Sequence, residues 1–393
     1  MQYEQALSYL FSRERFGIRL GLANIRKLLQ RLDNPHKNLR FIHIAGTNGK
    51  GSCCAMISSI LQEQGYKVGL YTSPHLVDFR ERIQINNRKI SRQDLAMLTD
   101  KIKPLIKSQT FFEVTTAIAF RYFKDKKVDF VVTEVGMGGR LDATNVIRPL
   151  VSLITNVAFE HKEHLGDTIE KIAYEKAGII KNNTPTVTSA DGKALKVIET
   201  ICKKRNSRLT VVKINRDIHT NLEGSFQLIN ASASVAAINI LEQQGIKISG
   251  SSITKGLKKV IWPARMQFIS KNILLDCAHN PPAVKILVKE LNKLKNKYNK
   301  FILLTGIMKD KDIRNMIKML SSLVDHMIIT RPNLERAAHP EYIAKFIEKG
   351  NPKYTIIPSV KEAVRFGKSI TGKKDLLFIT GSIYTVGEAM HYL

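Results

Sequence analysis

The chain has 393 residues, of which 44% are hydrophobic and 24% charged, and its formal net charge is +28. These values are typical of a globular protein that is long enough for two domains. They exclude a membrane-spanning protein, since no apolar run is long enough to cross a bilayer, and the start of the chain lacks the basic and apolar regions of a signal peptide. The sequence therefore predicts a cytoplasmic protein.

The excess of Lys and Arg raises nucleic acid as a possible partner. The lysines are spread along the chain, however, and aromatic residues do not alternate with basic ones as they do in RNA-binding proteins. A basic surface that attracts small anionic substrates is the better interpretation, so neither nucleic acid nor a membrane is expected as a partner. The four cysteines show no metal-ligand spacing and are expected to be free, mostly buried thiols.

The first forty residues predict two helices joined by a loop, and the element that follows them organises the chain. It reads Phe41-Ile-His-Ile-Ala-Gly-Thr-Asn-Gly-Lys-Gly-Ser52. Its apolar start predicts a buried strand, and apolar residues spaced as on one helix face predict a helix from about Lys50 to a left-handed cap at Gly65. Between them lies a glycine-rich turn.

A strand, a glycine-rich turn and a helix N-terminus together form a site for polyphosphate, because several backbone N–H groups and the helix dipole point at one anion. Lys50 is placed to contact the β and γ phosphates, and Ser52 to reach a magnesium ion. The spelling departs from the standard phosphate loop, since Gly51 separates the lysine from the serine. A purely structural turn is the alternative, but the flanking strand and helix favour phosphate.

After this turn the pattern alternates between strands and helices. The polar stretch at 72–83, with turn chemistry at Ser73-Pro74, is expected to be a surface loop that contacts ligand. The predicted elements are strands at 67–72, 128–135, 151–155, 185–188 and 209–212, and helices from Ser91 to about 107 and at 112–125, 168–180, 193–205 and 227–241.

Two of these strands are followed by polar residues that suit a hard cation. Glu134 stands at the end of one strand and His161 follows the next. Open α/β sheets bind ligands at the carboxyl ends of their strands, and a magnesium ion beside ATP needs one or two protein ligands besides phosphate oxygens. A capping or ion-paired Glu134 and a structural His161 are the alternatives. On the helix at 227–241, Gln227 and Asn230 stand out, and capping is their structural interpretation.

The pattern changes near Ile261-Trp-Pro-Ala-Arg265 and restarts as a smaller α/β domain. We therefore expect an α/β protein with a mostly parallel sheet domain of the phosphate-loop type at 1–262 and a second, smaller α/β domain at 263–393. Asp276 ends a strand there, and Asn280-Pro281 begins a helix as cap and first residue. A nucleotide held between the two domains, with Arg265 swinging onto phosphate, predicts an ATP-dependent transferase or ligase. The predicted strands are at 266–270, 273–277, 301–305, 325–330, 354–357 and 375–380, and the predicted helices follow Asn280 and lie at 312–321, 340–348, 359–368 and from Ser382.

Several motifs resemble the folylpolyglutamate synthase/dihydrofolate synthase family of the Mur ligase superfamily. They occur in the family's order over nearly the whole chain, and no UDP-sugar-binding domain precedes the phosphate loop. The matching stretches are Ala45–Ser52, Thr72–Leu76, Glu81–Ile83, Phe112-Glu113, Glu134–Asn145, Glu175–Ile179 and Asp276–Pro281. The resemblance implies that ATP phosphorylates a carboxylate of dihydropteroate or of a folate glutamate tail, and that L-glutamate then attacks the acyl phosphate. It also implies a Mur ligase-like fold.

The resemblance also implies a role for particular residues. Lys50, His161 and Lys176 are catalytic candidates, and Lys176 would be carbamylated to approach a second magnesium ion; from the residues alone, Lys176 is an ordinary lysine on a helix surface. The ATP contacts would be Asn48, Gly49, Lys50, Gly51, Ser52, Asn230, Arg265, Asp276 and His279. The magnesium ligands would be Ser73, Glu134 and His161. The pterin pocket would be Leu20, Gly21, Leu22, Ala23, Phe111, Phe112, Asp142 and Ala143.

Two departures from the family pattern bear on these roles. Glu160 stands where relatives have Asp before the metal histidine, and Phe226 where they have His before the glutamine of the adenine helix. A nucleotide-binding protein without ligase chemistry is disfavoured because all four of Lys50, Glu134, His161 and Lys176 are present. A monofunctional folylpolyglutamate synthase and a Mur-type amide ligase for another anionic acceptor stay open, as do a monovalent cation and the oligomeric state, for which a monomer is expected.

Overall fold

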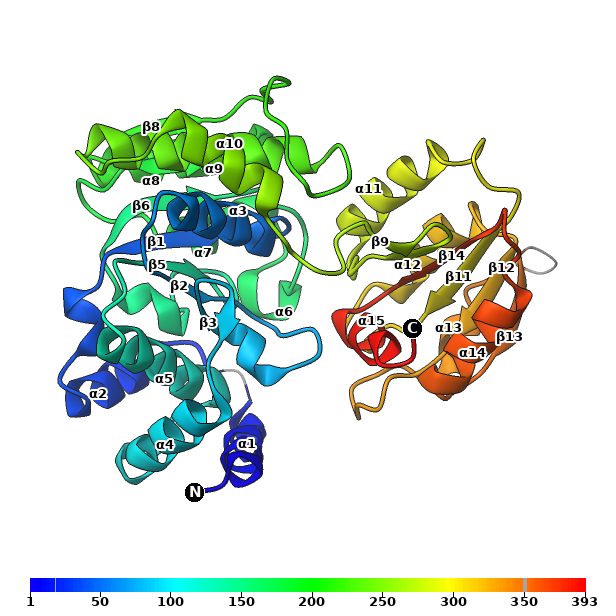
Figure 1. Cartoon of the computed structure of the whole chain (residues 1–393), viewed down its shortest axis with the longest axis horizontal. Coiled ribbons are helices and arrows are strands. Elements are labelled where there is room, and N and C mark those ends of the chain that lie inside the picture. Colours follow the sequence, from blue (N-terminus) through cyan, green and yellow to red (C-terminus); the bar gives the residue numbers. More distant parts are fainter. Residues whose placement is uncertain (18, 349–351) are drawn as a thin grey trace. The chain divides into compact units, whose positions relative to one another are not determined.

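The computed structural model describes residues 1–17, 19–348 and 352–393. The chain divides into two compact units (Figure 1). The first comprises Met1–His75, Phe79–Asn221 and Gln227–Ile261, and the second comprises Leu76–Asp78, Leu222–Phe226 and Trp262–Leu393. The main division thus lies next to the boundary expected at 262, but two short segments from earlier in the chain belong to the second unit, and no composition change marks them.

The first unit is built on an eight-stranded sheet with the order β4-β3-β2-β5-β1-β6-β7-β8. From β2 to β8 the neighbouring strands are parallel, and β3 and β4 add an antiparallel hairpin at one edge. The strands are β1 Phe41–Ala45, β2 Val68–Tyr71, β3 Ile83–Ile85, β4 Arg88–Lys89, β5 Phe130–Glu134, β6 Pro149–Ile154, β7 Thr186–Thr188 and β8 Leu209–Val211.

The hairpin was not predicted from the sequence. Asn86 and Asn87 join its strands and both have a left-handed backbone, with φ of 46° and 61°. Two left-handed residues match the twist of a tight hairpin, and Asn accepts this conformation better than most residues. The Asn-Asn pair was therefore a usable signal in the stretch between the loop predicted at 72–83 and the helix predicted from Ser91, for which no element was predicted.

Helices cover both faces of this sheet, as is typical of parallel sheets. One face packs against α3 and α9, and the other against α5 and α7. The helices are α1 Tyr3–Ser12, α2 Ala23–Arg31, α3 Lys50–Glu63, α4 Arg92–Ile102, α5 Phe111–Asp125, α6 Lys162–Leu165, α7 Ile169–Ala177, α8 Gly192–Lys204, α9 Gln227–Gln243 and α10 Gly250–Lys259.

The predicted apolar stripe on α3 is only part of its buried surface, because every residue from Gly51 to Leu61 is buried. The unpredicted helix α10 covers its outer side. The Ser59 hydroxyl donates to the Gly256 carbonyl over 2.7 Å, and a Cβ at Gly256 would lie 2.5 Å from the Ile60 Cα. The small residue thus lets two helices approach closely, so the helix that carries the phosphate loop is held from both sides.

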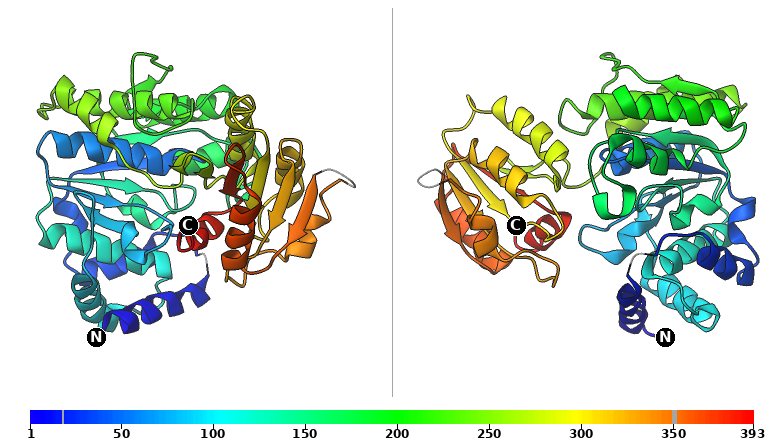
Figure 2. Two further views of the ribbon diagram at one scale, coloured as in Figure 1. Left: turned by 45° about the vertical axis from the view of Figure 1, so that its right-hand side comes forward. Right: turned by 180° about the vertical axis from the view of Figure 1, so that it is seen from behind.

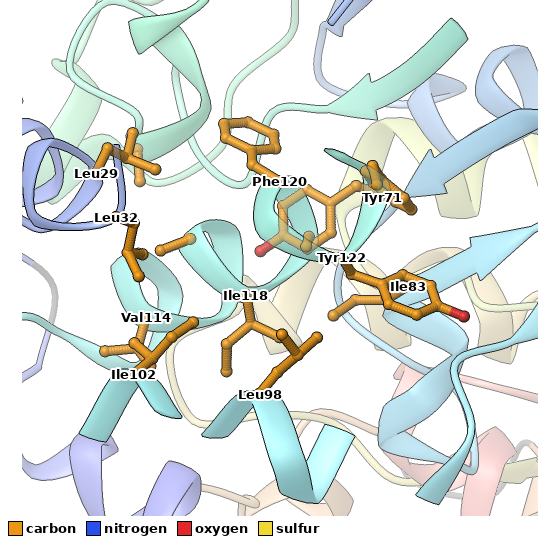
Figure 3. Packing of buried hydrophobic residues seen from close by; sticks show 14 of the residues in the cluster. Leu29, Leu32, Tyr71, Ile83, Leu98, Ile102, Val114, Ile118, Phe120 and Tyr122 are labelled. Carbon is orange, nitrogen blue, oxygen red and sulfur yellow. The ribbon is translucent and has the colours of Figure 1, made fainter. Parts of the chain in front are cut away.

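One large apolar cluster of the described residues joins α5 to α2, α4 and the sheet. Its side chains interlock around Phe120 and Ile118 (Figure 3). A capping box fixes the start of α5, with the Thr110 hydroxyl accepting from the Glu113 N–H and the Glu113 carboxylate accepting from the Thr110 N–H. Burying a side chain such as Phe120 contributes about 1.5–3 kcal/mol, and this packing positions Phe112 and the strand ends beside it.

The second unit has a six-stranded sheet with the order β13-β12-β11-β14-β10-β9, in which only the pairing of β9 with β10 is antiparallel. Helices cover both faces of this sheet (Figure 2). On each face an apolar cluster packs between the strands and these helices. The predicted helix at 340–348 is shorter than expected and ends at Ala344. The elements are β9 Gln267–Ser270, β10 Ile273–Leu275, α11 Pro281–Asn292, β11 Phe301–Thr305, α12 Ile313–Ser321, β12 His326–Ile329, α13 Pro340–Ala344, β13 Lys353–Ile356, α14 Val360–Ile370, β14 Leu376–Thr380 and α15 Ile383–Met390.

Within the described part of the chain, no helix is both long and apolar enough to cross a membrane. All four cysteines are free and buried, as predicted.

Candidate nucleotide and active site

The phosphate loop connects the carboxyl end of β1 to the first residue of α3, Lys50. Two of its glycines have positive φ angles, 143° at Gly46 and 88° at Gly49. A side chain at Gly46 would overlap the Thr155 hydroxyl, and one at Gly49 would overlap the Asn230 side-chain oxygen. Glycine is therefore required at both positions, by conformation and by space.

Polar groups at the end of β6 anchor this loop. The Thr47 N–H donates to the Asn156 carbonyl and the Asn48 N–H to the Asn156 side-chain oxygen, both over 2.8 Å. The Thr155 hydroxyl donates to the Asn48 carbonyl over 2.7 Å. Sequence reasoning missed Thr155 and Asn156 as supports, although a polar pair directly after a buried strand was a signal for them. Gly51 and Ser52 lie in the first turn of α3, where backbone N–H groups lack partners within the helix.

Two lysines converge on one carbonyl oxygen of the loop. The Lys50 Nζ donates to the carbonyls of Gly46 and Thr47 over 3.1 and 3.0 Å, and the Lys176 Nζ donates to the Gly46 carbonyl over 3.0 Å. The helix N-terminus adds positive potential at the same place. The structure thus brings together Lys50 and Lys176, which lie 126 positions apart (176 − 50) in the chain, and the pair would attract a phosphate group.

The interpretation of Lys176 as a helix-surface lysine is wrong. Its side chain is 1% exposed, and its ammonium forms an ion pair with Glu160, which is 10% exposed. Burial lowers the pKa of Lys176, and Lys50 adds to this while Glu160 opposes it. Burial raises the pKa of Glu160, but Lys176, Lys50 and His161 outweigh burial and bring that pKa down to about 2. Residue 160, noted from the sequence only as a departure, is therefore the partner of Lys176.

The candidate metal ligands differ in their exposure to solvent. Glu134 is buried at the end of β5, and its carboxylate accepts from the Ser73 N–H over 3.1 Å, next to a cis Ser73–Pro74 bond. Glu134 also contributes to raising the pKa of the thiols of Cys53 and Cys54, so it lies near the start of α3. His161 has a left-handed backbone, with φ of 44°, and is exposed.

Among the residues that the structure describes, no three His, Cys, Asp or Glu form a cluster that could hold a metal ion by themselves. One buried carboxylate and one hydroxyl residue beside a phosphate loop still fit Mg²⁺, because this ion takes few protein ligands and completes its shell with water and phosphate oxygens. The donor set therefore fits a metal bound together with a nucleotide.

The adenine-side candidate Asn230 lies against the phosphate loop. Its side-chain nitrogen donates to Gln227 Oε1 over 2.9 Å, and its main-chain oxygen accepts from the Cys53 thiol over 3.5 Å. Neither Asn230 nor Gln227 acts as the helix cap considered from the sequence. The side-chain nitrogen of Gln227 is buried without a hydrogen-bond partner in the structure. Phe226 belongs to the second unit and packs on its apolar core.

The candidate pterin residues form three sets of contacts. The Gly21 N–H donates to the Leu141 carbonyl over 3.4 Å, which joins the segment Leu20–Ala23 to the loop that carries Asp142 and Ala143. The Phe112 ring stacks near Tyr71 at 6.0 Å and would be 2.6 Å from a Cβ at Gly136. The Phe111 ring instead stacks on Phe11 at 5.6 Å. Sequence reasoning missed Phe11 and Tyr71, whose isolated positions gave no signal.

Asp142 has a structural function that the sequence did not indicate. Its carboxylate accepts from the Met137 N–H over 2.9 Å and from the Thr144 N–H and hydroxyl over 3.0 and 2.6 Å. The Thr144 hydroxyl also lies 2.9 Å from His43 Nε2. Burial raises the pKa of Asp142 against these hydrogen bonds. The Gly136 N–H is a further backbone donor to this carboxylate. A carboxylate has about four acceptor positions, so these hydrogen bonds account for about all of them.

In the second unit, Asp276 organises the segment that carries Arg265. Its carboxylate accepts from the Met266 N–H over 2.9 Å and from the Ala278 N–H over 2.8 Å. Ala264 and Met266, on either side of Arg265, have φ of 57° and 49°. Burial raises the pKa of Asp276, and Arg265 opposes this most strongly. His279 Nδ1 lies 2.9 Å from the Cys277 carbonyl, and Asn280 caps α11 as predicted.

Comparison with known proteins places these features in a context. Residues 44–217 match the family model of the Mur ligase middle domain, and residues 264–383 match that of the Mur ligase glutamate ligase domain. The dihydrofolate synthase/folylpolyglutamate synthase of Bacillus subtilis is 34% identical over 98% of each chain.

Two solved structures are also similar to the chain. Escherichia coli FolC in complex with DHPP and ADP has 29% identity and a TM-score of 0.89, with 98% of this chain and 97% of that chain covered. A bifunctional folylpolyglutamate synthase/dihydrofolate synthase from Yersinia pestis, complexed with AMPPNP and Mn ion, has 29% identity and a TM-score of 0.89, with 100% and 98% covered.

Proposed function

The chain belongs to the dihydrofolate synthase/folylpolyglutamate synthase family of Mur-type ligases, as its motifs predicted, and we propose that it joins L-glutamate both to dihydropteroate and to the glutamate tail of folates. The predicted fold class and the ATP-dependent ligase activity are confirmed with the family. The observation that carries the proposal is the convergence of Lys50 and Lys176 on Gly46, in a loop that only glycine can form.

The reaction needs ATP because a carboxylate is a poor electrophile. A carboxylate oxygen of the acceptor attacks the γ-phosphorus of ATP, the bond to the bridging oxygen breaks, and ADP leaves. The amine of L-glutamate then attacks the acyl carbon, inorganic phosphate leaves with its C–O bond electrons, and the amine proton passes to solvent. We assign Asn48, Gly49, Gly51 and Ser52 to the triphosphate, and Lys50 to the charge that develops on the transferred phosphoryl group.

We assign Ser73, Glu134 and His161 to a divalent ion, which would neutralise phosphate charge when bound. The buried Glu134 beside the start of α3 supports this assignment, and the Mn ion in the Yersinia pestis relative supports a divalent metal in the family. A second magnesium ion and a monovalent cation remain part of the proposal, and an activity titration with Mg²⁺ at several K⁺ concentrations tests both.

We propose that Lys176 reacts with CO2 as a neutral amine, forming a carbamate and releasing one proton. Carbamylation requires an unprotonated amine, and burial lowers the pKa of this lysine toward that state. The neighbouring Glu160 would then face a second negative charge, so the carbamate needs a cation near it. Mass spectrometry under CO2 with trapping by alkylation tests the modification; an unmodified Lys176 in active enzyme would contradict it.

Asn230, Arg265, Asp276 and His279 are assigned to the nucleotide. Asp276 supports the Arg265 segment through backbone hydrogen bonds, so we expect it to act mainly by positioning that arginine. We assign the pterin to a pocket formed by Leu20, Gly21, Leu22, Ala23, Phe111, Phe112, Asp142 and Ala143.

A coupled assay of ADP release tests the function. It is run with dihydropteroate, with tetrahydrofolate and without acceptor, each with and without L-glutamate. ADP release that requires an acceptor and glutamate is expected with both acceptors. Release with tetrahydrofolate alone would identify a monofunctional folylpolyglutamate synthase, and release with neither would indicate a Mur-type ligase for another acid. Size-exclusion chromatography with light scattering tests the expected monomer.

A further inference from the structure

A second basic site lies in the first unit, separate from the phosphate loop. It is a cavity of about 660 Å³ formed by the loops around residues 140–148 and 178–183 together with α2 and the end of α8. Its lining includes five cations, Arg26, Arg140, Arg148, Lys181 and Arg205. No Asp or Glu of the described chain lines it.

Among the residues that the structure describes, Arg140 alone of the five cations has a carboxylate partner, Glu175, over 2.8 Å. Around the other four, the described residues place no Asp or Glu oxygen within 4.0 Å of the charged nitrogens. Arg26, Arg148 and Arg205 are exposed, whereas Arg140 and Lys181 are partly buried. Like charges that line one cavity repel each other, and solvent screens this repulsion only in part. The folded chain therefore maintains an unbalanced positive charge here that an anion would offset.

The central lysine of the cavity is fixed in position. The Lys181 Nζ donates to the side-chain and main-chain oxygens of Asn145 over 2.6 and 3.0 Å. Asn145 is buried, and its side-chain nitrogen donates to the carbonyls of Arg140 and Gly178 over 2.9 and 3.0 Å. Burial, together with Arg205 and Arg26, lowers the pKa of Lys181 to about 8. Neutral oxygens thus hold the Lys181 ammonium group in place, while burial and the two nearby arginines destabilise its charged form.

Part of the cavity lies at the amino ends of β6, β7 and β8, whereas the phosphate loop follows the carboxyl end of β1. Arg148 directly precedes the first residue of β6, and Arg205 precedes β8. The Asn183 N–H, before β7, donates to the Arg205 carbonyl over 2.9 Å. These strands run parallel to β1, whose other end carries Gly46. A five-residue strand spans roughly 17 Å, so the same small ligand cannot occupy both places.

We propose that this cavity is a second anion site, which binds a small polyanion carrying two or more phosphate or carboxylate groups. Guanidinium groups pair with either anion through two hydrogen bonds, and several converging cations require several anionic groups. The volume is in the range of small-molecule sites. Two sources share this chemistry, a phosphorylated metabolite and a γ-linked glutamate chain. The inference does not depend on the proposed ligase activity.

Isothermal titration of the full chain with pyrophosphate and with tetra-γ-glutamate, in metal-free buffer, tests the proposal. Because the phosphate loop also attracts pyrophosphate, the titrations are repeated in Lys50→Ala, in which one equivalent should still bind. Arg148→Gln with Arg205→Gln should weaken binding about tenfold or more, since each removes a charge-assisted hydrogen-bond donor. Lys196→Gln, on exposed α8 surface, is the matched control and should bind as the unaltered chain does.

The site is supported if either anion binds to the unaltered chain and to Lys50→Ala but more weakly to the double variant. The anion that binds in this way identifies the source of the ligand. Failure of both anions to bind, or equal affinity in the double variant, would overturn it. Proton uptake gives a second measurement, made on the unaltered chain and on Lys181→Met. An anion beside Lys181, which faces Arg26, Arg205 and Asn145, raises its pKa, so binding near pH 8 should take up protons in the unaltered chain that Lys181→Met does not take up, seen as a difference in the buffer dependence of the enthalpy. Equal proton uptake by the two chains would place the anion elsewhere and contradict the proposal.

Discussion

Lys176 and Lys181 stand five positions apart (181 − 176), but Lys176 is buried, Lys181 is only partly buried, and their surroundings differ. Lys176 has the carboxylate of Glu160 against its ammonium group. Lys181 has only the neutral oxygens of Asn145, with Arg26 and Arg205 nearby. Burial lowers the pKa of both. The first environment supplies its own counterion, and the second lacks one, so a lowered pKa alone does not reveal what a lysine is for.

The largest effect on stability is expected when the lysine that has a carboxylate partner is removed. In CO2-free buffer, where Lys176 is an ammonium group paired with Glu160, Lys176→Met leaves Glu160 without its main cation, and the free energy of unfolding should fall by about 3–5 kcal/mol. Denaturant unfolding measures it. The double variant with Glu160→Gln should recover a large part of the loss, because no charge is then left unpaired. An equal loss in both variants would mean that packing rather than charge stabilises this region.

Lys50 is a third lysine of the first unit, and the role proposed for it is in the reaction rather than in the stability of the fold. Lys50→Ala should lower turnover by about two orders of magnitude or more, as expected when a charge aimed at the transferred phosphoryl group is lost. The rate of ADP release measures it. The unfolding midpoint should change little, since Lys50 is only half-buried, and Lys196→Ala serves as the matched control for turnover. Turnover near that of the unaltered chain would contradict the assignment of the loop.

The effect of Glu160→Gln on stability at acid pH isolates the contribution of Glu160 from those of the other carboxylates. Its pKa falls from 4.5 to about 2 on folding, so its stabilising contribution is complete above pH 4.5 and is lost as the pH falls toward 2. We expect the difference in unfolding free energy between the unaltered chain and Glu160→Gln to shrink across this range. Urea unfolding at several pH values measures it, and a pH-independent difference would argue against the ion pair.

The smallest expected effect concerns Lys181 at alkaline pH. Its pKa is 10.5 when unfolded and about 8 when folded, so the folded state holds fewer protons between these values. The unaltered chain should therefore gain stability relative to Lys181→Met as the pH rises from 8 to 10.5. Urea unfolding of both variants in this range measures the gain. Added pyrophosphate should reduce it if the anion site exists, while a flat difference would show that Lys181 is solvated.

Much of the fold followed from local patterns. The strand at 41–45, the helix beginning at Lys50 and the caps at Ser91 and Asn280 were predicted, and the structure has them. Each depends on residues close together in the sequence, which is why periodicity and capping chemistry suffice. The helix α10 and the hairpin at β3 and β4 were not predicted, because the helix is short and its apolar face meets α3 only in the folded chain.

The candidate site was predictable only in part, for the same reason. The phosphate loop is contiguous, so its residues could be identified from one motif. The burial of Lys176 and its pairing with Glu160 depend on contacts between β1, the segment after β6 and α7. The basic cavity likewise assembles Arg26, Arg148, Lys181 and Arg205 from four separate segments. In the sequence each of these is one more cation in a chain with 62 of them.

The two segments Leu76–Asp78 and Leu222–Phe226 limit how the two halves of the chain can be recombined with those of relatives. Leu76 and Phe226 fill places in the apolar clusters of the second unit, and a side chain at Gly387 would overlap the Leu76 carbonyl. A gene fragment encoding only the residues from Trp262 onward would therefore specify an incomplete core. The N-terminal and C-terminal halves of this protein therefore do not form independent units for exchange. A chimera of two relatives should fold only when these two segments come from the same parent as the C-terminal half.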